Sequence, residues 1–241
     1  MKTSVGVDGC KAGWFAVAIT DAGEWSHAVY ESAAALLDRY GDVGRILIDI
    51  PIGLVDRRPT ERQCDLEAWR LLGKPRSASV FPVPSRATLS APTYEEAIRV
   101  NREETGRGLS RQAWGIVPKV REVDQLMQQS QLARDTFVEV HPELLFWALN
   151  GQRAMEHHKG RGKGRSERLG VLQRWFPTAE EVYASAAYMY MRKHVAFDDI
   201  IDAMVAAVAG VVGTGQLIDV PEPPETDSTG LPMRMAIPAV V

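Results

Sequence analysis

The chain has 241 residues, of which 45% are hydrophobic and 24% charged, a composition typical of a soluble globular protein with one large domain. Its formal net charge of -3 excludes an overall attraction to nucleic acid or to an anionic membrane, so any polyanion must meet a local basic cluster. The longest apolar stretch, residues 203–212, is far shorter than the roughly 20 residues that cross a bilayer, which excludes a membrane span.

The first fifty residues are expected to form strands and one helix in the order β-β-β-α-β. Three short apolar runs, separated by the turns D-G-C-K-A-G and D-A-G, predict a three-stranded meander. These runs are residues 4–7, 14–20 and 24–30. Ser32 then caps a helix that ends at residue 40. The segment I-L-I-D-I at 46–50 is typical of a buried strand, and it ends at Pro51.

Residues 51–134 are expected to form a helical insertion beside the sheet. T-E-R-Q at Thr60 and T-Y-E-E at Thr93 are capping-box patterns, each of which predicts the start of a helix. The proline-rich stretch 74–85 between them predicts neither a helix nor a central strand. We interpret the whole chain, residues 1–241, as a single domain that contains this insertion.

Strand and helix patterns return after the insertion. T-F-V-E-V-H-P predicts a strand, and Pro142 begins a helix that ends at residue 150. Further helices are expected at 166–176, 178–194 and 198–213. The tail 221–230 is rich in proline and is expected to form a linker-like turn region, and 231–238 could add an edge strand.

Two aspartates stand where a buried strand would normally carry an apolar residue. Asp8 ends the first strand and Asp49 lies inside the fourth. If these strands are parallel neighbours, the two carboxylates lie side by side and repel each other, unless a cation lies between them. The alternative for Asp8 is a turn residue, because D-G is a common turn pair.

The last long helix carries a further pair of acids. Asp199 and Asp202 are three residues apart and therefore share one face, and Ala203 and Ala206 are small enough for that helix to approach the sheet. Asp199 could also cap the helix, whereas Asp202 lies beyond the capping positions and needs another partner. Four converging carboxylates suit Mg²⁺ or Mn²⁺, and the absence of a Cys/His cluster disfavours zinc.

A series of segments resembles a bacterial and archaeal protein family, domain of unknown function 429. These segments are G-V-D-G-C-K-A-G-W, I-D-I-P-I-G-L, Q-A-W-G-I-V-P-K-V-R-E-V-D, E-V-H-P-E-L-L-F-W-A-L-N-G and D-D-I-I-D-A-M-V-A-A. The resemblance covers the chain from about residue 4 to Pro238. Members of this family are regarded as RNase H-like nucleases, so the resemblance implies an α/β RNase H-like fold. That fold has a mixed five-stranded sheet in the order β-β-β-α-β-α-β-α, here with a helical insertion between strands 4 and 5.

The resemblance also implies a site. In related Holliday-junction resolvases, acids at corresponding places hold two divalent ions, and by motif these metal-binding roles fall on Asp8, Asp49, Asp199 and Asp202. Glu139 and His141 share one face of the later strand. We interpret Glu139 as a metal ligand or an acid behind the ligands, and His141 as a general base or phosphate contact, with a packing role as the alternative. Lys11 could neutralise a phosphate oxygen.

A nucleic-acid partner would also have to be held along its backbone. The densest basic run follows residue 158, and a second set lies in the insertion. The predicted contacts are Lys159, Arg161, Lys163, Arg165 and Arg168, together with Lys119 and Arg121. The alternative for the first run is a solvated flexible loop.

The sequence therefore predicts a nuclease that hydrolyses phosphodiester bonds of DNA or RNA with Mg²⁺ or Mn²⁺ in a two-metal mechanism. The alternatives are a non-catalytic nucleic-acid-binding module and, less favoured, a phosphotransferase or a hydrolase of small phosphoesters. The two cysteines lack metal-binding spacing and the N-terminus lacks a signal-peptide pattern, so we expect a cytoplasmic protein without a membrane partner. A homodimer is left open.

Overall fold

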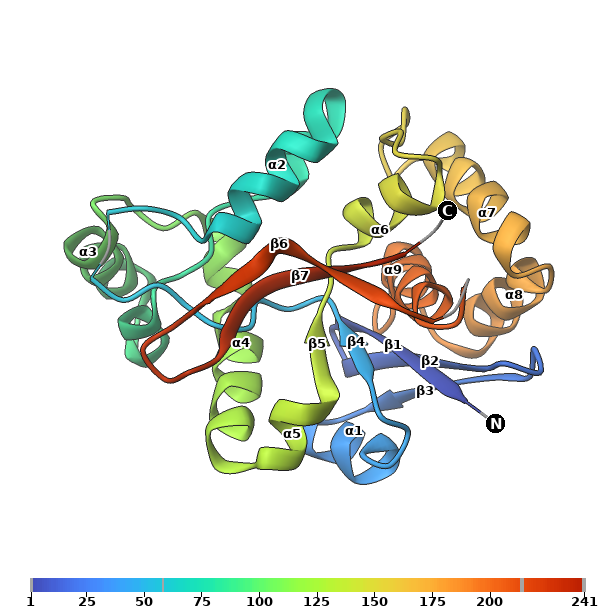
Figure 1. Ribbon diagram of the computed structural model, residues 1–241, viewed down its shortest axis with the longest axis horizontal. Coiled ribbons are helices and arrows are strands. Elements are labelled where there is room, and N and C mark those ends of the chain that lie inside the picture. Colours follow the sequence, from blue (N-terminus) through green and yellow to red (C-terminus); the bar gives the residue numbers. More distant parts are fainter. Residues whose placement is uncertain (1, 58, 213–214, 240–241) are drawn as a thin grey trace.

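A five-stranded mixed sheet lies at the centre of the computed structural model, which describes residues 2–57, 59–212 and 215–239 (Figure 1). The strands are β1 (Thr3–Cys10), β2 (Gly13–Thr20), β3 (Trp25–Tyr30), β4 (Ile46–Ile48) and β5 (Phe137–Glu139). They lie in the order β3-β2-β1-β4-β5, with β1 parallel to β4 and β4 parallel to β5, and the other neighbours antiparallel. The predicted meander and the predicted parallel pairing of the first and fourth strands are confirmed.

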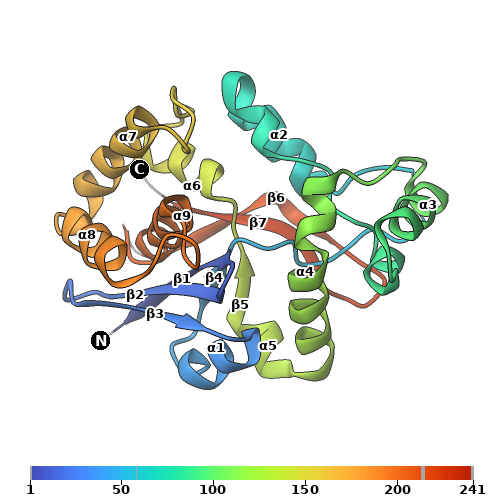
Figure 2. The ribbon, with the colours of Figure 1, turned by 180° about the vertical axis from the view of Figure 1, so that it is seen from behind.

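Helices cover both faces of this sheet (Figures 1 and 2). One face carries α1 (Ala33–Tyr40), α4 (Arg111–Gln129) and α5 (Gln131–Thr136). The other face carries α6 (Pro142–Leu149), α7 (Gly162–Trp175), α8 (Ala179–Met189) and α9 (Phe197–Ala209). Alternate residues of a strand point to opposite faces of the sheet. Val5 and Val7 of β1 pack on the face of α1 and α4, whereas Phe15 of β2 and Leu47 of β4 pack on the face of α9. Within the described residues, no helix has the length and hydropathy that a membrane crossing requires.

The helix starts show which sequence signals operate. Ser32 caps α1 by accepting from the Ala35 N–H, and Thr93 caps α3 (Tyr94–Thr105) by accepting from the Glu96 N–H, as predicted. Thr60 caps no helix, because α2 (Gln63–Arg76) begins three residues later. The chain between Gly73 and α3 is mostly irregular, with short 3₁₀ turns at Ser77–Ser79 and Arg86–Ser90.

Several elements end at a different residue from the one predicted. The fourth strand ends at Ile48, so Asp49 follows β4 and does not lie inside it. The helix expected to run to Gly213 is α9, which ends at Ala209, and residue 213 lies outside the described residues. The helix expected at 178–194 is α8, which ends at Met189.

The proline-rich tail is the largest departure from the predicted elements. Its residues 221–226 belong to β6 (Leu217–Thr226), which pairs with β7 (Pro232–Pro238) in a separate two-stranded antiparallel sheet, whereas residues 227–230 form the turn, as predicted. The register shifts between Val220 and Glu225, so the intervening prolines stay outside the ladder that they could not complete. The edge strand expected at 231–238 therefore exists, but its partner is β6.

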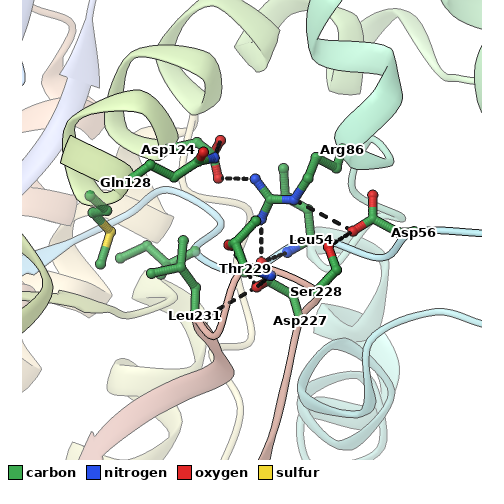
Figure 3. A network of polar contacts seen from close by, with 12 residues as sticks. Leu54, Asp56, Arg86, Asp124, Gln128, Asp227, Ser228, Thr229 and Leu231 are labelled. Atoms are coloured by element: carbon green, nitrogen blue, oxygen red, sulfur yellow. Dashed lines mark hydrogen bonds and ion pairs between the residues drawn. The ribbon is translucent and has the colours of Figure 1, made fainter.

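A network of polar contacts fixes the turn of this hairpin to the insertion. Figure 3 shows the Arg86 guanidinium between Asp124 of α4, Asp56 of the loop after β4, and Asp227 of the hairpin turn. The Asp227 carboxylate also accepts the backbone N–H groups of Leu54 and Leu231, each at 3.0 Å. Three segments that are distant in sequence are thus joined by one buried charge cluster.

Candidate active site

Asp8 and Asp49 lie side by side because their strands are parallel neighbours. Val7 is the register partner of Ile48, and the Asp49 N–H donates to the Val7 carbonyl at 3.0 Å, which extends the pairing by one residue. Asp8 is buried, and one of its carboxylate oxygens accepts the Gly9 N–H at 2.7 Å. The sequence-based placement of these two aspartates at one edge of the sheet is therefore confirmed.

Helix α9 brings the second pair of acids to the same region. A Cβ on Gly6 would lie 2.1 Å from the Ala203 carbonyl oxygen, so only a glycine on β1 allows this close approach. Asp202 is 2% exposed, and its Oδ1 has no hydrogen-bond partner. Asp199 is partly buried and accepts the Ala196 N–H at 2.7 Å, which is the capping role left open by the sequence.

The carboxylates interact strongly with one another. Burial raises the pKa of Asp8 well above its usual range, and the charges of Asp49 and Asp202 raise it further. Burial, together with the Asp202 charge, raises the pKa of Asp49 to about 8. Burial also raises the pKa of Asp199 to about 6. Such mutual repulsion in a buried cluster is relieved by a positive charge.

Lys159 supplies a positive charge at this cluster. Its Nζ lies 2.5 Å from Asp202 Oδ2, and its charge lowers the pKa of Asp8 and of Asp49 against the larger opposing effect of burial. The charge of Asp202 raises the pKa of Lys159, with smaller contributions from Asp8 and Asp49. The residue that was expected to contact a nucleic-acid backbone thus contacts the predicted metal ligands.

The chemistry of the donor set suits a hard divalent cation. Asp8, Asp49 and Asp202 offer carboxylate oxygens, and the orphaned Asp202 Oδ1 is an acceptor that a cation would satisfy. Within the described residues, no group of three or more His, Cys, Asp and Glu side chains is already arranged to hold a metal ion. Two contacts account for this, since Asp199 is turned to the backbone of Ala196 and Asp202 to Lys159.

Glu139 lines the same cavity as Asp8 and Asp49, but its carboxylate is held by other partners. It is the register partner of Ile48, which packs on the face of the sheet opposite α9. There its carboxylate accepts from both terminal nitrogens of Arg62, at 2.7 and 2.8 Å, and from the Ile52 N–H at 2.6 Å. Arg62 is fully buried and also binds Asp65. Glu139 is therefore engaged in an internal ion pair, and its predicted role as a metal ligand or an acid behind the ligands stays a prediction.

His141 lies two residues after Glu139, directly before α6. Burial lowers the pKa of its imidazole, so the neutral ring is favoured. Nε2 lies 3.4 Å from the Ser79 carbonyl oxygen, which can only accept a hydrogen bond, so the ring proton belongs on Nε2. Nδ1 then carries a lone pair, and this buried atom has no hydrogen-bond partner. The role predicted for His141, a general base or a phosphate contact, stays a prediction.

A cavity of about 490 Å³ adjoins these groups. It lies between the edge of the sheet and the helical insertion, and the residues that line it fall into three classes. Its acids include Asp8, Asp49 and Glu139, its cations include Arg76, Lys119 and Lys159, and its apolar residues include Ile50, Phe81 and Ile116. His141 also lines it. The candidate site is thus a partly open pocket with carboxylates and cations together.

Other predicted contacts lie elsewhere. Lys11 is exposed in the turn between β1 and β2 and does not line the cavity. Arg168 is fully buried, where it pairs with Glu143 and donates to the Gly164 carbonyl at 2.9 Å. Arg121 donates to the Leu89 carbonyl. Arg168 and Arg121 are thus engaged within the protein, and the phosphate contact predicted for the exposed Lys11 stays a prediction.

The remaining basic residues are divided between the pocket and the surface. Lys119 donates to the Gly13 carbonyl and lies 4.2 Å from the centre of the Trp14 ring, beside Gly9 at the cavity. Arg161 and Lys163 are exposed at the start of α7. The Arg165 guanidinium lies 5.1 Å from the centre of the Phe197 ring.

Two residues of the site carried no assigned role in the sequence interpretation, Arg62 and Arg76. Arg62 stands three residues before Asp65 at the start of α2, and this spacing is the signal that could have identified an internal ion pair. Arg76 lies in the proline-rich segment, where no periodicity indicates which way a side chain faces. Its buried Nε has no hydrogen-bond partner.

Comparison with known proteins gives one match. No significant match to the chain was found among curated proteins or among solved structures. The sequence model of one family, described as "Protein of unknown function (DUF429)", matches residues 6–226, which is most of the chain. The protein therefore belongs to the DUF429 family.

Proposed function

We propose that this protein is an RNase H-like hydrolase that cleaves phosphodiester bonds of DNA or RNA with a divalent cation, Mg²⁺ or Mn²⁺. One observation carries the proposal. The buried carboxylates of β1 and α9 and the partly buried one at the end of β4 approach one another, and the buried Asp202 Oδ1 has no partner. The strand order β3-β2-β1-β4-β5 supports the RNase H-like assignment.

In this proposal Asp8, Asp49 and Asp202 would hold the cation, which when bound polarises the phosphodiester and acidifies water. His141 takes one proton from the attacking water at Nδ1, the atom left without a partner. The water oxygen forms a bond to phosphorus, the bond from phosphorus to the leaving oxygen breaks, and that oxygen takes up a proton. The products are an alcohol and a phosphomonoester. Lys119 and Lys159 line the cavity as cations for the phosphate.

The test compares hydrolysis of bis(p-nitrophenyl) phosphate and of labelled oligonucleotides in Mn²⁺ by the parent, Asp8→Asn and Asp49→Asn. Each substitution removes a charged ligand but keeps the shape, so we expect a loss of more than about 100-fold in kcat/KM. Asp38→Asn is the matched control, because Asp38 is an exposed aspartate of α1. Its rate should equal that of the parent.

Thermal unfolding gives a second readout. Mn²⁺ should raise the Tm of the parent, because a ligand that binds the folded state stabilises it, and should leave the Tm of Asp49→Asn unchanged. Cleavage by both site variants at the parent rate would refute the proposal. A Tm shift without cleavage of any substrate would indicate the non-catalytic binding module instead.

A further inference from the structure

The size of the cavity limits what can reach the carboxylates. Its volume of about 490 Å³ falls in the range of sites for small molecules and cofactors, which is roughly 300–1,000 Å³. Proteins that bind long single strands use instead an open basic groove that follows several nucleotides. Two regions of the chain line the cavity. One is the insertion, and the other comprises α6 and the loop that carries Lys159.

The basic residues expected to hold a long backbone are mostly engaged within the protein. Arg168 is paired with Glu143, Arg121 with a backbone carbonyl, and Lys159 with Asp202. Binding of a long polyanion depends on many phosphate contacts made at once. Two of the expected contacts, Arg161 and Lys163, remain exposed at the start of α7, too few for the many simultaneous contacts that a long backbone requires.

The cavity itself offers what one nucleotide unit requires. Phe81 and Ile116 provide apolar area for a base or sugar, and Arg76 and Lys119 provide positive charge for one phosphate. The Arg76 Nε is buried and has no hydrogen-bond partner, so that side chain retains a donor for a ligand. Its Nη2 is held by the Glu156 carbonyl at 3.3 Å, which limits the motion of the guanidinium.

From these observations we infer that the pocket takes a single nucleotide-sized phosphoester, either free or at the end of a chain, and does not accept the interior of a long strand or a duplex. The inference rests on the proposed hydrolysis of a phosphodiester, and the reaction is the one balanced above. A chain end and a small nucleotide ester share the same recognised chemistry, namely one base, one sugar and one phosphodiester.

The experiment offers three substrates to the full chain in Mn²⁺. They are the p-nitrophenyl ester of thymidine 5′-monophosphate, a linear single-stranded oligonucleotide, and the same oligonucleotide closed into a circle. We expect cleavage of the small ester, and where chain ends are also accepted, stepwise release of mononucleotides from the linear strand. The circle should be cut at least about 100-fold more slowly than the faster of the other two, because no end can enter the pocket.

The outcomes separate the two proposals. Cutting of the circle as fast as the linear strand would overturn the inference and leave the proposed hydrolysis standing. Cleavage of none of the three would refute the proposed hydrolysis, and the inference with it. Cleavage of the small ester alone identifies a free nucleotide ester as the substrate source, and cleavage of both open substrates identifies chain ends as well.

A cavity-filling variant and a salt titration test recognition directly. Ile116→Trp should raise KM for the small ester by about tenfold and keep the Mn²⁺-induced Tm shift of the parent, because the larger ring fills part of the cavity and removes no carboxylate. Val80→Trp provides a second variant should the first fail to fold. For the linear strand, log KM should change with log salt by a slope of about 0.7, the value for one phosphate contact, whereas a slope of about 4 or more would contradict the inference.

Discussion

His27 shows how one side chain makes stability depend on pH. It lies on β3 with Nε2 at 3.0 Å from the Ser185 hydroxyl and Nδ1 at 3.3 Å from the Tyr190 hydroxyl. Burial lowers the pKa of His27 below the 6.5 of a free histidine. The unfolded chain therefore binds more protons than the folded one, and stability falls as the pH decreases below 6.5 towards the folded pKa.

His27→Gln should reduce this dependence. Between pH 7 and pH 5 the free energy of unfolding, measured by urea denaturation, should decrease in the parent relative to the variant. The raised pKa values of Asp8, Asp49 and Asp199 act in the opposite direction, but equally in both proteins. The buried His141 remains in both proteins, so part of the slope persists. His194→Gln is the control, because His194 is exposed and its substitution should keep the parent slope. Equal slopes in all three proteins would contradict the role of His27.

The residue scale also shows what a single sequence can reveal about a site. Asp8 and Asp49 were identifiable because each is an acid in an apolar strand pattern, and a period of two places both on the face of α9. The same period places Glu139 on the opposite face. Its true partner, Arg62, is 77 residues away in the chain, and no local pattern links them. Roles that depend on such distant contacts require the folded structure.

At the scale of elements, the contact of α9 with β1 determines where Asp202 lies relative to Asp8. Gly6 leaves no room for a side chain, since a Cβ there would lie 2.1 Å from both the Ala203 carbonyl oxygen and the Ala207 nitrogen. The obstructing atoms belong to the backbone and cannot rotate away. Small residues on α9 were visible in the sequence, but the matching glycine on β1 was not identifiable as their partner.

Gly6→Ala should therefore push α9 away from the sheet. Overpacking of this kind costs about 1–3 kcal/mol or more of unfolding free energy, which chemical denaturation measures. The matched control is Gly170→Ala in the interior of α7, where an added Cβ has nothing within 4 Å. That substitution should stabilise by about 0.5–1 kcal/mol, because alanine favours a helix. A Gly6→Ala protein as stable as the parent would show that the two elements are not in such close contact.

Helix starts illustrate why element boundaries were only partly predictable. Thr93 and Thr60 both head a capping-box pattern, yet only Thr93 caps a helix. After Thr60 the chain delays the helix until Gln63, so that Arg62 can donate to the Ile52 and Gly53 carbonyls, at 3.1 and 3.2 Å. A buried tertiary ion cluster thus decides where α2 begins, against the local signal.

At the scale of the whole molecule, the C-terminal hairpin is the feature that the sequence predicted least well. Proline in 221–230 indicated a turn region, because proline interrupts a ladder of hydrogen bonds. A two-stranded sheet tolerates this interruption, since a register shift leaves the prolines outside the ladder. The five-stranded sheet was predictable, because its apolar runs are continuous. The hairpin depends on contacts with distant segments, and its Met235 lines the candidate cavity.

Arg86 is the residue that joins those distant segments, so its loss should weaken the whole fold. Its side chain is 15% exposed and contacts the fully buried Asp227, as well as Asp124 at 2.5 Å (Figure 3). Arg86→Met would leave both carboxylates without their cation, and breaking a buried pair in this way costs about 3–5 kcal/mol. We expect a single cooperative unfolding transition, measured in urea, that moves to a lower midpoint.

Arg99→Met provides the comparison for this loss. Arg99 also pairs with two acids, Glu96 and Glu103, but its side chain is 57% exposed. Exposed ion pairs add little to the free energy of unfolding, because water solvates the charges when the pair is broken. Its midpoint should stay close to that of the parent. If both variants shift equally, the Arg86 cluster does not hold the hairpin to the insertion. Two separate transitions in Arg86→Met would show that the hairpin and the insertion unfold independently of the sheet. We expect one transition, because the contacts of Arg86 are not the only ones that join these segments.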